Sequence, residues 1–320
     1  MKSFVTALCL ICGTVTAVAQ HRTSVIIYNI DEPVFLASVQ KSVSNFLSEC
    51  NSAKYERRNP KWQSLTLTSS AQKSFSELWT KTNGFECRLT KYTTDIVKRE
   101  FDDKYEIRGI PLTVSLENGE LHEESGIVVV EGNGTIDDIL LGLETERYAM
   151  LTEGKSVSDF RRRQLILNFV EIFRTAYNRK DVKYLQDVFS DNALIIVGKI
   201  VEIKNDDVDM LGQLSEKQVV LIKKSKSEYM QDLKKAFSIN KFIQVEFDSI
   251  AIVQHKKYEE IYGVTMVQHW RSSIYSDVGY LFLVIDFKDE AKPIIYVRSW
   301  QNKEYTRQDE VIKLSDFSFE

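Results

Sequence analysis

The residues of this chain that could do chemistry gather in its last three apolar segments, which are typical of strands. They are Gln268, His269, Trp270, Asp286, Arg298 and Trp300. A carboxylate among apolar residues has its pKa raised by desolvation unless a cation lies nearby, and Arg298 could be that cation for Asp286. Because an isolated buried charge is unfavourable, we favour a structural ion pair between these two residues. The alternative is a site for a ligand or for acid/base chemistry.

If these strands line a pocket, the expected ligand contacts are Gln268, Trp270, Asp286, Arg298 and Trp300. The alternation of a strand leaves open whether Trp270 or its neighbour His269 faces inward. Acid/base chemistry would also require a Tyr or Asp acid opposite a carboxylate base. The tyrosines available on helices are Tyr177, Tyr184 and Tyr229, although packing is the more frequent role of such residues.

The usual signatures of phosphate, metal and nucleophile chemistry are absent from the sequence. It has no Gly-rich phosphate loop, no His or Cys pair at metal-ligand spacing and no G-x-S-x-G motif. The acidic residues Asp206, Asp207 and Asp209 lack the glycine and the distal glutamate of a calcium loop. We therefore expect no metal and no cofactor.

The stretch 161–195 provides the elements that must position the strands. Its apolar residues recur at i, i+3, i+4, i+7 and i+11, a spacing that predicts one long amphipathic helix. They are Ile166, Phe169, Val170, Phe173 and Tyr177. The polar corner 178–181 starts a second, shorter helix, and Ala193–Val197 is short and apolar enough to predict a strand.

The segments that follow predict a third helix and a set of long strands. Tyr229, Leu233 and Phe237 have helical spacing, and strands are expected over 242–253, 262–270, 280–287 and 293–300. The alternation of the first strand changes phase at 248–249, which predicts a β-bulge and hence a bend in the sheet. An apolar group in the tail 305–320 is expected to pack back on this unit.

The order of these elements resembles a known fold. The long helix, the stretch AYNRKDVKYLQDVFSDNALI and the strand-rich tail are similar to the nuclear transport factor two-like, or cystatin-like, superfamily over about Ser156 to Trp300. The resemblance implies helices packed in the hollow of a curved antiparallel sheet, a cone-shaped α+β domain. That superfamily includes transport factors, ketosteroid isomerases, SnoaL-type cyclases, dehydratases and pure binding modules, so the fold does not settle the activity.

The N-terminal half predicts a smaller α+β domain. A strand over 24–30, a helix starting at Pro33 and a helix over 71–79 precede short alternating runs between 85 and 143. Asn118-Gly119 is a hairpin signal between two of these runs, which indicates an antiparallel meander. The polar stretch Thr152–Ser156 marks the boundary, so we expect domains over 20–152 and 153–320.

Residues 1–19 have the pattern of a secretory signal. A basic start precedes an apolar run over 4–15, and residues 17–19 (AVA) match a signal-peptidase site. The run is shorter than the about 20 residues that a membrane span requires. We therefore expect cleavage after Ala19 and an exported protein, periplasmic or secreted, of a Gram-negative cell envelope.

Cys50 and Cys87 are the cysteines outside that signal. In an oxidising compartment they could form a disulfide, and two separate buried thiols are the alternative.

Composition restricts the partners. The formal charge of −4, with both signs interspersed, gives no electrostatic case for nucleic acid or for an anionic membrane surface. We expect an unknown small molecule or an envelope protein as partner, no nucleic acid and no membrane span. A homodimer through the face of the C-terminal sheet is a further arrangement that this fold allows.

The sequence therefore predicts an exported binding or assembly module. The alternative is an isomerase, cyclase or dehydratase-like enzyme that uses the cone pocket. The pocket distinguishes the two: a cone filled by Phe and Trp side chains supports a scaffold, whereas an open cavity that holds Asp286 or a tyrosine supports chemistry.

Overall fold

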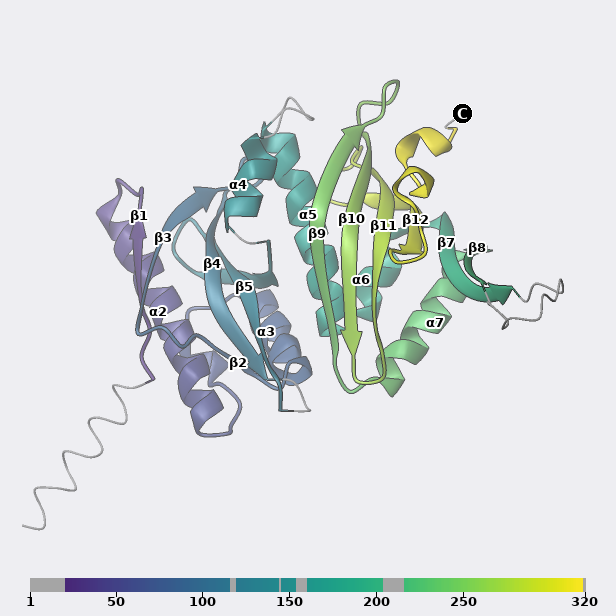
Figure 1. Cartoon of the computed structure of the whole chain (residues 1–320). Coiled ribbons are helices and arrows are strands. Elements are labelled where there is room, and N and C mark those ends of the chain that lie inside the picture. The colour runs from purple at the N-terminus through teal and green to yellow at the C-terminus, as the bar shows by residue number, and fades with distance from the viewer. Residues whose placement is uncertain (1–20, 116–118, 144, 154–159, 204–215, 319–320) are drawn as a thin grey trace, which may run out of the picture. The chain divides into compact units, whose positions relative to one another are not determined.

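The computed structural model describes residues 21–115, 119–143, 145–153, 160–203 and 216–318 (Figure 1). The chain divides into two compact units, Met1–Tyr148 and Ala149–Glu320. The predicted signal, 1–19, lies outside the described residues. The predicted boundary at 152/153 falls at the end of helix α4 (Thr145–Glu153), which begins before the unit boundary. No glycine or proline interrupts that stretch, so the helix continues to Glu153.

The first unit is an α+β domain, as predicted. Its elements are β1 (Ser24–Tyr28), α2 (Pro33–Tyr55), α3 (Ser69–Lys81), β2 (Phe85–Glu86), β3 (Lys91–Lys98), β4 (Lys104–Ser115), β5 (Leu121–Glu131) and β6 (Ile136–Leu141). The sheet order is β1-β3-β4-β5-β6, with β2 paired to β4. Strands β3 to β6 form the expected antiparallel meander, whereas β1 pairs with β3 in parallel.

Helix α2 packs through the predicted apolar stripe, and an aromatic cluster fills the space beside it. Pro33 occupies the first turn of α2, where its missing N–H removes no helix bond. The Phe46 ring lies 4.8 Å from the Phe75 ring, and Trp79 packs edge-on against Phe85 at 5.4 Å. Trp79 is thus a core residue.

Cys50 and Cys87 lie in this unit as free, buried thiols, and a disulfide between them in an oxidising compartment stays a prediction. The Asn51 side chain joins α2 to the segment around Cys87, accepting from its backbone N–H and donating to its carbonyl, each at 2.8 Å. Burial raises the pKa of both thiols. Both thiols are therefore held in their less reactive, protonated form.

The second unit has the predicted order of helices and strands. Its elements after α4 are α5 (Phe160–Arg179), α6 (Val182–Asp187), β7 (Phe189–Ile203), β8 (Glu216–Lys224), α7 (Lys226–Ile239), β9 (Ile243–Gln254), β10 (Ile261–Ser272), β11 (Ser276–Asp286) and β12 (Ile294–Asn302). The sheet order is β8-β7-β12-β11-β10-β9, antiparallel except where β12 pairs with β7. This confirms the α+β cone of helices on a mainly antiparallel sheet.

Helices α5, α6 and α7 lie on one face of this sheet (Figure 1). Helix α5 packs on the sheet through its aromatic residues. The ring centroid of Phe169 lies 5.8 Å from that of Phe287, and the ring centroid of Phe173 lies 6.3 Å from that of Phe247. A capping box of Ser225 and Glu228 fixes the start of α7. The predicted β-bulge is present, since the β9–β10 register shifts opposite Asp248 and Ser249 has a positive φ of 51°.

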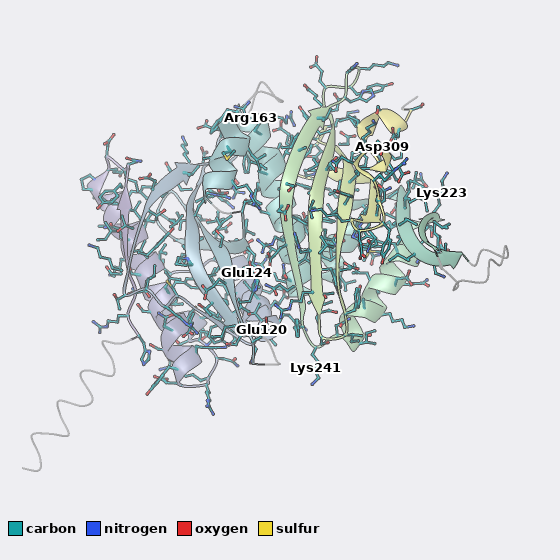
Figure 2. The ribbon with its side chains drawn as sticks, in the orientation of Figure 1. Glu120, Glu124, Arg163, Lys223, Lys241 and Asp309 are labelled. Atoms are coloured by element: carbon teal, nitrogen blue, oxygen red, sulfur yellow. The ribbon has the colours of Figure 1, made fainter. Side chains whose placement is uncertain are left out.

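The other face of the same sheet is covered by the C-terminal segment. Ile312 and Leu314 pack with Phe282, Val284 and Val297. Phe317 stacks on the Phe282 ring at 5.9 Å. The predicted packing of the tail is confirmed, and Figure 2 shows Asp309 of this segment near one end of the sheet and Lys241 near the other. A homodimer through this face stays a prediction, with part of the face already covered by the chain itself.

None of the helices in the described ranges is long and apolar enough to span a membrane.

Candidate ligand-binding cavity

A cavity of 280 Å³ lies between α5, α7 and the inner face of the second sheet. Tyr275, which lines the cavity, lies in the β10–β11 turn, where Ser273 accepts from the backbone N–H of Lys241. The cavity is therefore at the end of the sheet marked by Lys241 in Figure 2. Its wall includes Tyr177, Tyr229, Gln268, Trp270, Tyr275, Asp277, Arg298 and Trp300. The cone is therefore open at this end, whereas Phe169, Phe173, Phe247 and Phe287 fill the space farther along α5.

Arg298 on β12 is the buried cation of this cavity, and only 6% of it is exposed. Its guanidinium lies over the Tyr229 ring, 4.8 Å from the centroid. Burial opposes its charge, but Tyr229, Tyr177 and Asp277 together hold the pKa of Arg298 above its ordinary value. No carboxylate of the described residues forms an ion pair with it. Arg298 is thus a buried cation whose nearest neighbours are phenols.

Four polar atoms on this wall have no hydrogen-bond partner. They are Arg298 Nε, Trp270 Nε1, Trp300 Nε1 and Asp277 Oδ1. More than about 90% of buried polar groups in native proteins are paired, so four unpaired atoms at one cavity need a reason. Three of them are N–H donors and one is a carboxyl oxygen.

Asp277 is the carboxylate on the sheet side of the cavity, opposite Trp270 in the β10–β11 register. Burial raises the pKa of Asp277 to about 6, and Arg298 only partly offsets this effect. A carboxyl group with this pKa exchanges its proton close to neutral pH.

Tyr177 and Tyr275 of the cavity stay protonated at neutral pH, because burial raises the pKa of both. The hydroxyls of Tyr177 and Tyr229 lie 2.5 Å apart and are hydrogen-bonded to each other. Burial, followed by the neighbouring Tyr229, raises the pKa of Tyr177 well above its ordinary value. Burial also raises the pKa of Tyr275 to about 12, and its ring stacks on Trp270 at 6.1 Å. The third candidate, Tyr184, lines a separate groove beside Asp187 and Pro293.

Of the residues expected to contact a ligand, Gln268, Trp270, Arg298 and Trp300 line the cavity. The open question of strand parity is resolved in favour of Trp270. His269 lies on the opposite face and contacts Asp248 through Nε2 at 2.5 Å.

Asp286 does not line the cavity, and the predicted Asp286–Arg298 ion pair was wrong. Asp286 lies at the end of β11, where it accepts from the Lys288 backbone at 2.7 Å and from the Tyr296 hydroxyl at 3.3 Å. The residue opposite Arg298 in the register is Leu283. An offset of three residues in a strand puts Asp286 on the other face.

Sequence reasoning missed Asp277 because β11 begins at Ser276, four residues before the predicted start. A signal was available, since Asp277 continues the alternation of Gly279, Leu281 and Leu283 along one face. Gly279 also has a role here: a Cβ at this position would lie 2.4 Å from the Trp300 ring, so only glycine lets that indole reach the cavity.

Comparison with known proteins finds only partial likenesses at low identity. No family model matches the chain, and no curated protein does. Bd1075 from Bdellovibrio bacteriovorus is 11% identical over 67% of this chain and 92% of its own, with a TM-score of 0.33. An NTF2-like protein from Cytophaga hutchinsonii is 14% identical over 44% of this chain and 98% of its own, with a TM-score of 0.32. A putative scytalone dehydratase from Novosphingobium aromaticivorans is 9% identical over 44% and 84% of the two chains, with a TM-score of 0.31.

Proposed function

We propose that this protein is a binding module that takes up a small organic molecule in the cavity of its C-terminal unit. The observation that carries the proposal is the set of four unpartnered polar atoms on one cavity wall. A buried donor or acceptor without a partner destabilises a protein by about 1–3 kcal/mol. All four atoms belong to residues that line the cavity, so a ligand that satisfies them would recover that free energy on binding.

The size of the cavity agrees with this function. Ligand pockets commonly enclose about 300–1,000 Å³ and combine apolar walls with a few polar groups. At 280 Å³ this cavity is just below the lower end of that range, which suits a small molecule with one or two rings. Because the cone is open and holds tyrosines, a ligand site is better supported than a closed scaffold.

Export belongs to the same proposal and rests on the pattern of residues 1–19. We expect the protein recovered from a bacterial periplasm to begin near Gln20. Intact-mass measurement tests this, and a periplasmic protein that retains residues 1–19 would contradict it.

A second candidate is an enzyme that transfers protons in the same cavity. The observation that favours it is Asp277, whose pKa of about 6 suits a general base, on a wall shared with the Tyr177–Tyr229 pair. The phenols could stabilise an oxyanion, as an acid/base site of this kind requires. Binding without turnover leaves the binding module as the function. Turnover that Asp277→Asn abolishes, while binding persists, would replace it by the enzyme.

The experiment is a screen of small aromatic compounds by ligand-observed NMR with three proteins. Ala236 lines the cavity from α7, so Ala236→Trp fills it, while Lys235→Trp adds the same side chain at an exposed position of the same helix. We expect compounds that bind the wild type and Lys235→Trp but lose binding to Ala236→Trp. Binding that survives in Ala236→Trp, or no binding to the folded wild type, would overturn the proposed cavity function.

A further inference from the structure

We infer that the cavity selects a planar organic acid, whose carboxylate is held by Arg298 and by the indole N–H groups of Trp270 and Trp300. This inference rests on the proposed function, because it names the ligand class of the same cavity.

The first argument is the balance of donors and acceptors. Three of the four unpartnered atoms, on Arg298, Trp270 and Trp300, are N–H donors. An indole N–H and an arginine N–H can only donate, so the matching ligand group must be an acceptor with several lone pairs. A carboxylate provides two oxygens with about four acceptor positions. An alcohol or a single carbonyl would leave part of this set unpaired.

The second argument is charge. Arg298 is 94% buried, since 6% is exposed, and among the described residues it forms no ion pair. The other cation of the wall, Lys224, is already paired with Asp232 at 2.5 Å. A neutral ligand would further desolvate Arg298 without compensating its charge, which is unfavourable. An anionic group supplies the missing partner and forms a charge-assisted hydrogen bond.

The third argument is the shape of the wall. Trp270 stacks on Tyr275 with 16° between the ring planes, and Tyr177 meets the same indole edge-on at 81°. Flat aromatic walls favour a flat, apolar ligand body. The remaining acceptor, Asp277 Oδ1, can accept from a hydroxyl on that body. The chemistry therefore fits a hydroxylated aromatic carboxylic acid.

The test compares 4-hydroxybenzoate with its neutral amide, 4-hydroxybenzamide, by isothermal titration calorimetry. The two probes share ring and hydroxyl and differ in the charged group. We expect the wild type to bind the acid about ten- to hundredfold more tightly than the amide, the range expected for a hydrogen bond to a charged group. Arg298→Gln should remove this preference, and Arg307→Gln, an exposed arginine outside the cavity, should retain it.

Trp300→Phe is a second variant that tests the inference even if Arg298→Gln does not fold. It keeps an aromatic ring at this position and removes one N–H donor. We expect it to reduce the preference for the acid by about three- to tenfold, as for one lost hydrogen bond. Equal binding of acid and amide by the wild type would overturn the acid class and leave the cavity function standing. A preference for the acid that is unchanged in both Arg298→Gln and Trp300→Phe would also overturn it. If neither probe binds, and the aromatic screen also gives no compound sensitive to Ala236→Trp, the cavity function itself fails.

Discussion

Two buried arginines, one in each unit, show the difference between a structural charge and a charge held for a ligand. Arg108 in β4 is 2% exposed, and its Nη1 lies 2.6 Å from Glu106, itself 2% exposed. Glu106 also lies 3.2 Å from Arg99, and the Arg108 guanidinium covers the Tyr148 ring at 3.5 Å. Arg108 therefore has both a carboxylate and an aromatic surface from its own unit.

Arg298 is almost as buried as Arg108, but its neighbours are the Tyr229 ring and the Tyr177 hydroxyl, with no carboxylate of the described residues at ion-pair distance. Its carboxylate neighbour, Asp277, acts on it from beyond ion-pair distance and has a pKa raised by burial to about 6. Burying a charge without a close partner is unfavourable, so a protein keeps one where function needs it. The comparison teaches that burial alone does not identify a functional charge. What distinguishes the two arginines is whether the chain completes the ion pair itself.

The largest expected effect is on the paired charges of the first unit. Glu106→Gln leaves Arg108 and Arg99 without their shared carboxylate, and breaking a buried pair in this way destabilises a protein by about 3–5 kcal/mol. Urea unfolding measures the total loss, and hydrogen exchange of peptides from β4 and β5 assigns it to this unit. A loss below about 1 kcal/mol would place this pair among exposed ion pairs and break the comparison.

A smaller effect of opposite sign is expected at Arg298. Arg298→Met keeps much of the volume and removes a cation without a close partner, so we expect unchanged stability or a gain of about 1 kcal/mol. The same unfolding experiment measures it, with hydrogen exchange of peptides from β11 and β12 as the local reading. A loss as large as that of Glu106→Gln would show that Arg298 is structural, and the ligand proposal would lose its basis.

The helices of the second unit could be predicted because their core faces repeat at the helical period. The stripe from Ile166 to Tyr177 and the spacing of Tyr229, Leu233 and Phe237 each depend on one element alone. The bulge near Asp248 was visible for the same reason, as a change of phase within one strand. Local patterns of this kind need no knowledge of neighbouring strands.

The carboxylate that lies on the same face as Arg298 could not be predicted, because it depends on register between strands. Asp277 and Asp286 are both carboxylates of β11, and only the pairing of Leu283 with Arg298 shows which of them reaches the inner face. The early start of β11 at Ser276 is likewise a consequence of pairing with Arg271 in β10. Residue types thus identified Trp270, Trp300 and Arg298, and register was needed to identify Asp277.

An effect of similar size is a pH dependence that belongs to Asp277. Its folded pKa of about 6 is above the ordinary aspartate value of 3.8, because burial disfavours the charged form. Between these two values the folded state holds a proton that the unfolded state has already lost. The contribution of Asp277 to stability therefore falls as pH rises from about 4 to about 6, and its full penalty is present above pH 6.

The asparagine of Asp277→Asn cannot ionise, so we expect this variant to lack the decrease in stability between about pH 4 and about pH 6. At pH 7 it should be more stable than the wild type. The gain should be about 1 kcal/mol, because partial solvent contact screens the carboxylate.

The other charged or titratable groups on this wall are Arg298, Tyr177, Tyr229, Tyr275, Lys224 and Asp232. Asp232→Asn is the control, since this exposed carboxylate is paired with Lys224. If Asp277→Asn follows the wild type across the whole range, or if Asp232→Asn removes the fall instead, Asp277 is not the desolvated carboxylate of the cavity. The contrast between the paired Arg108 and the unpaired Arg298 would then be supported only by the results for the Arg298 variants.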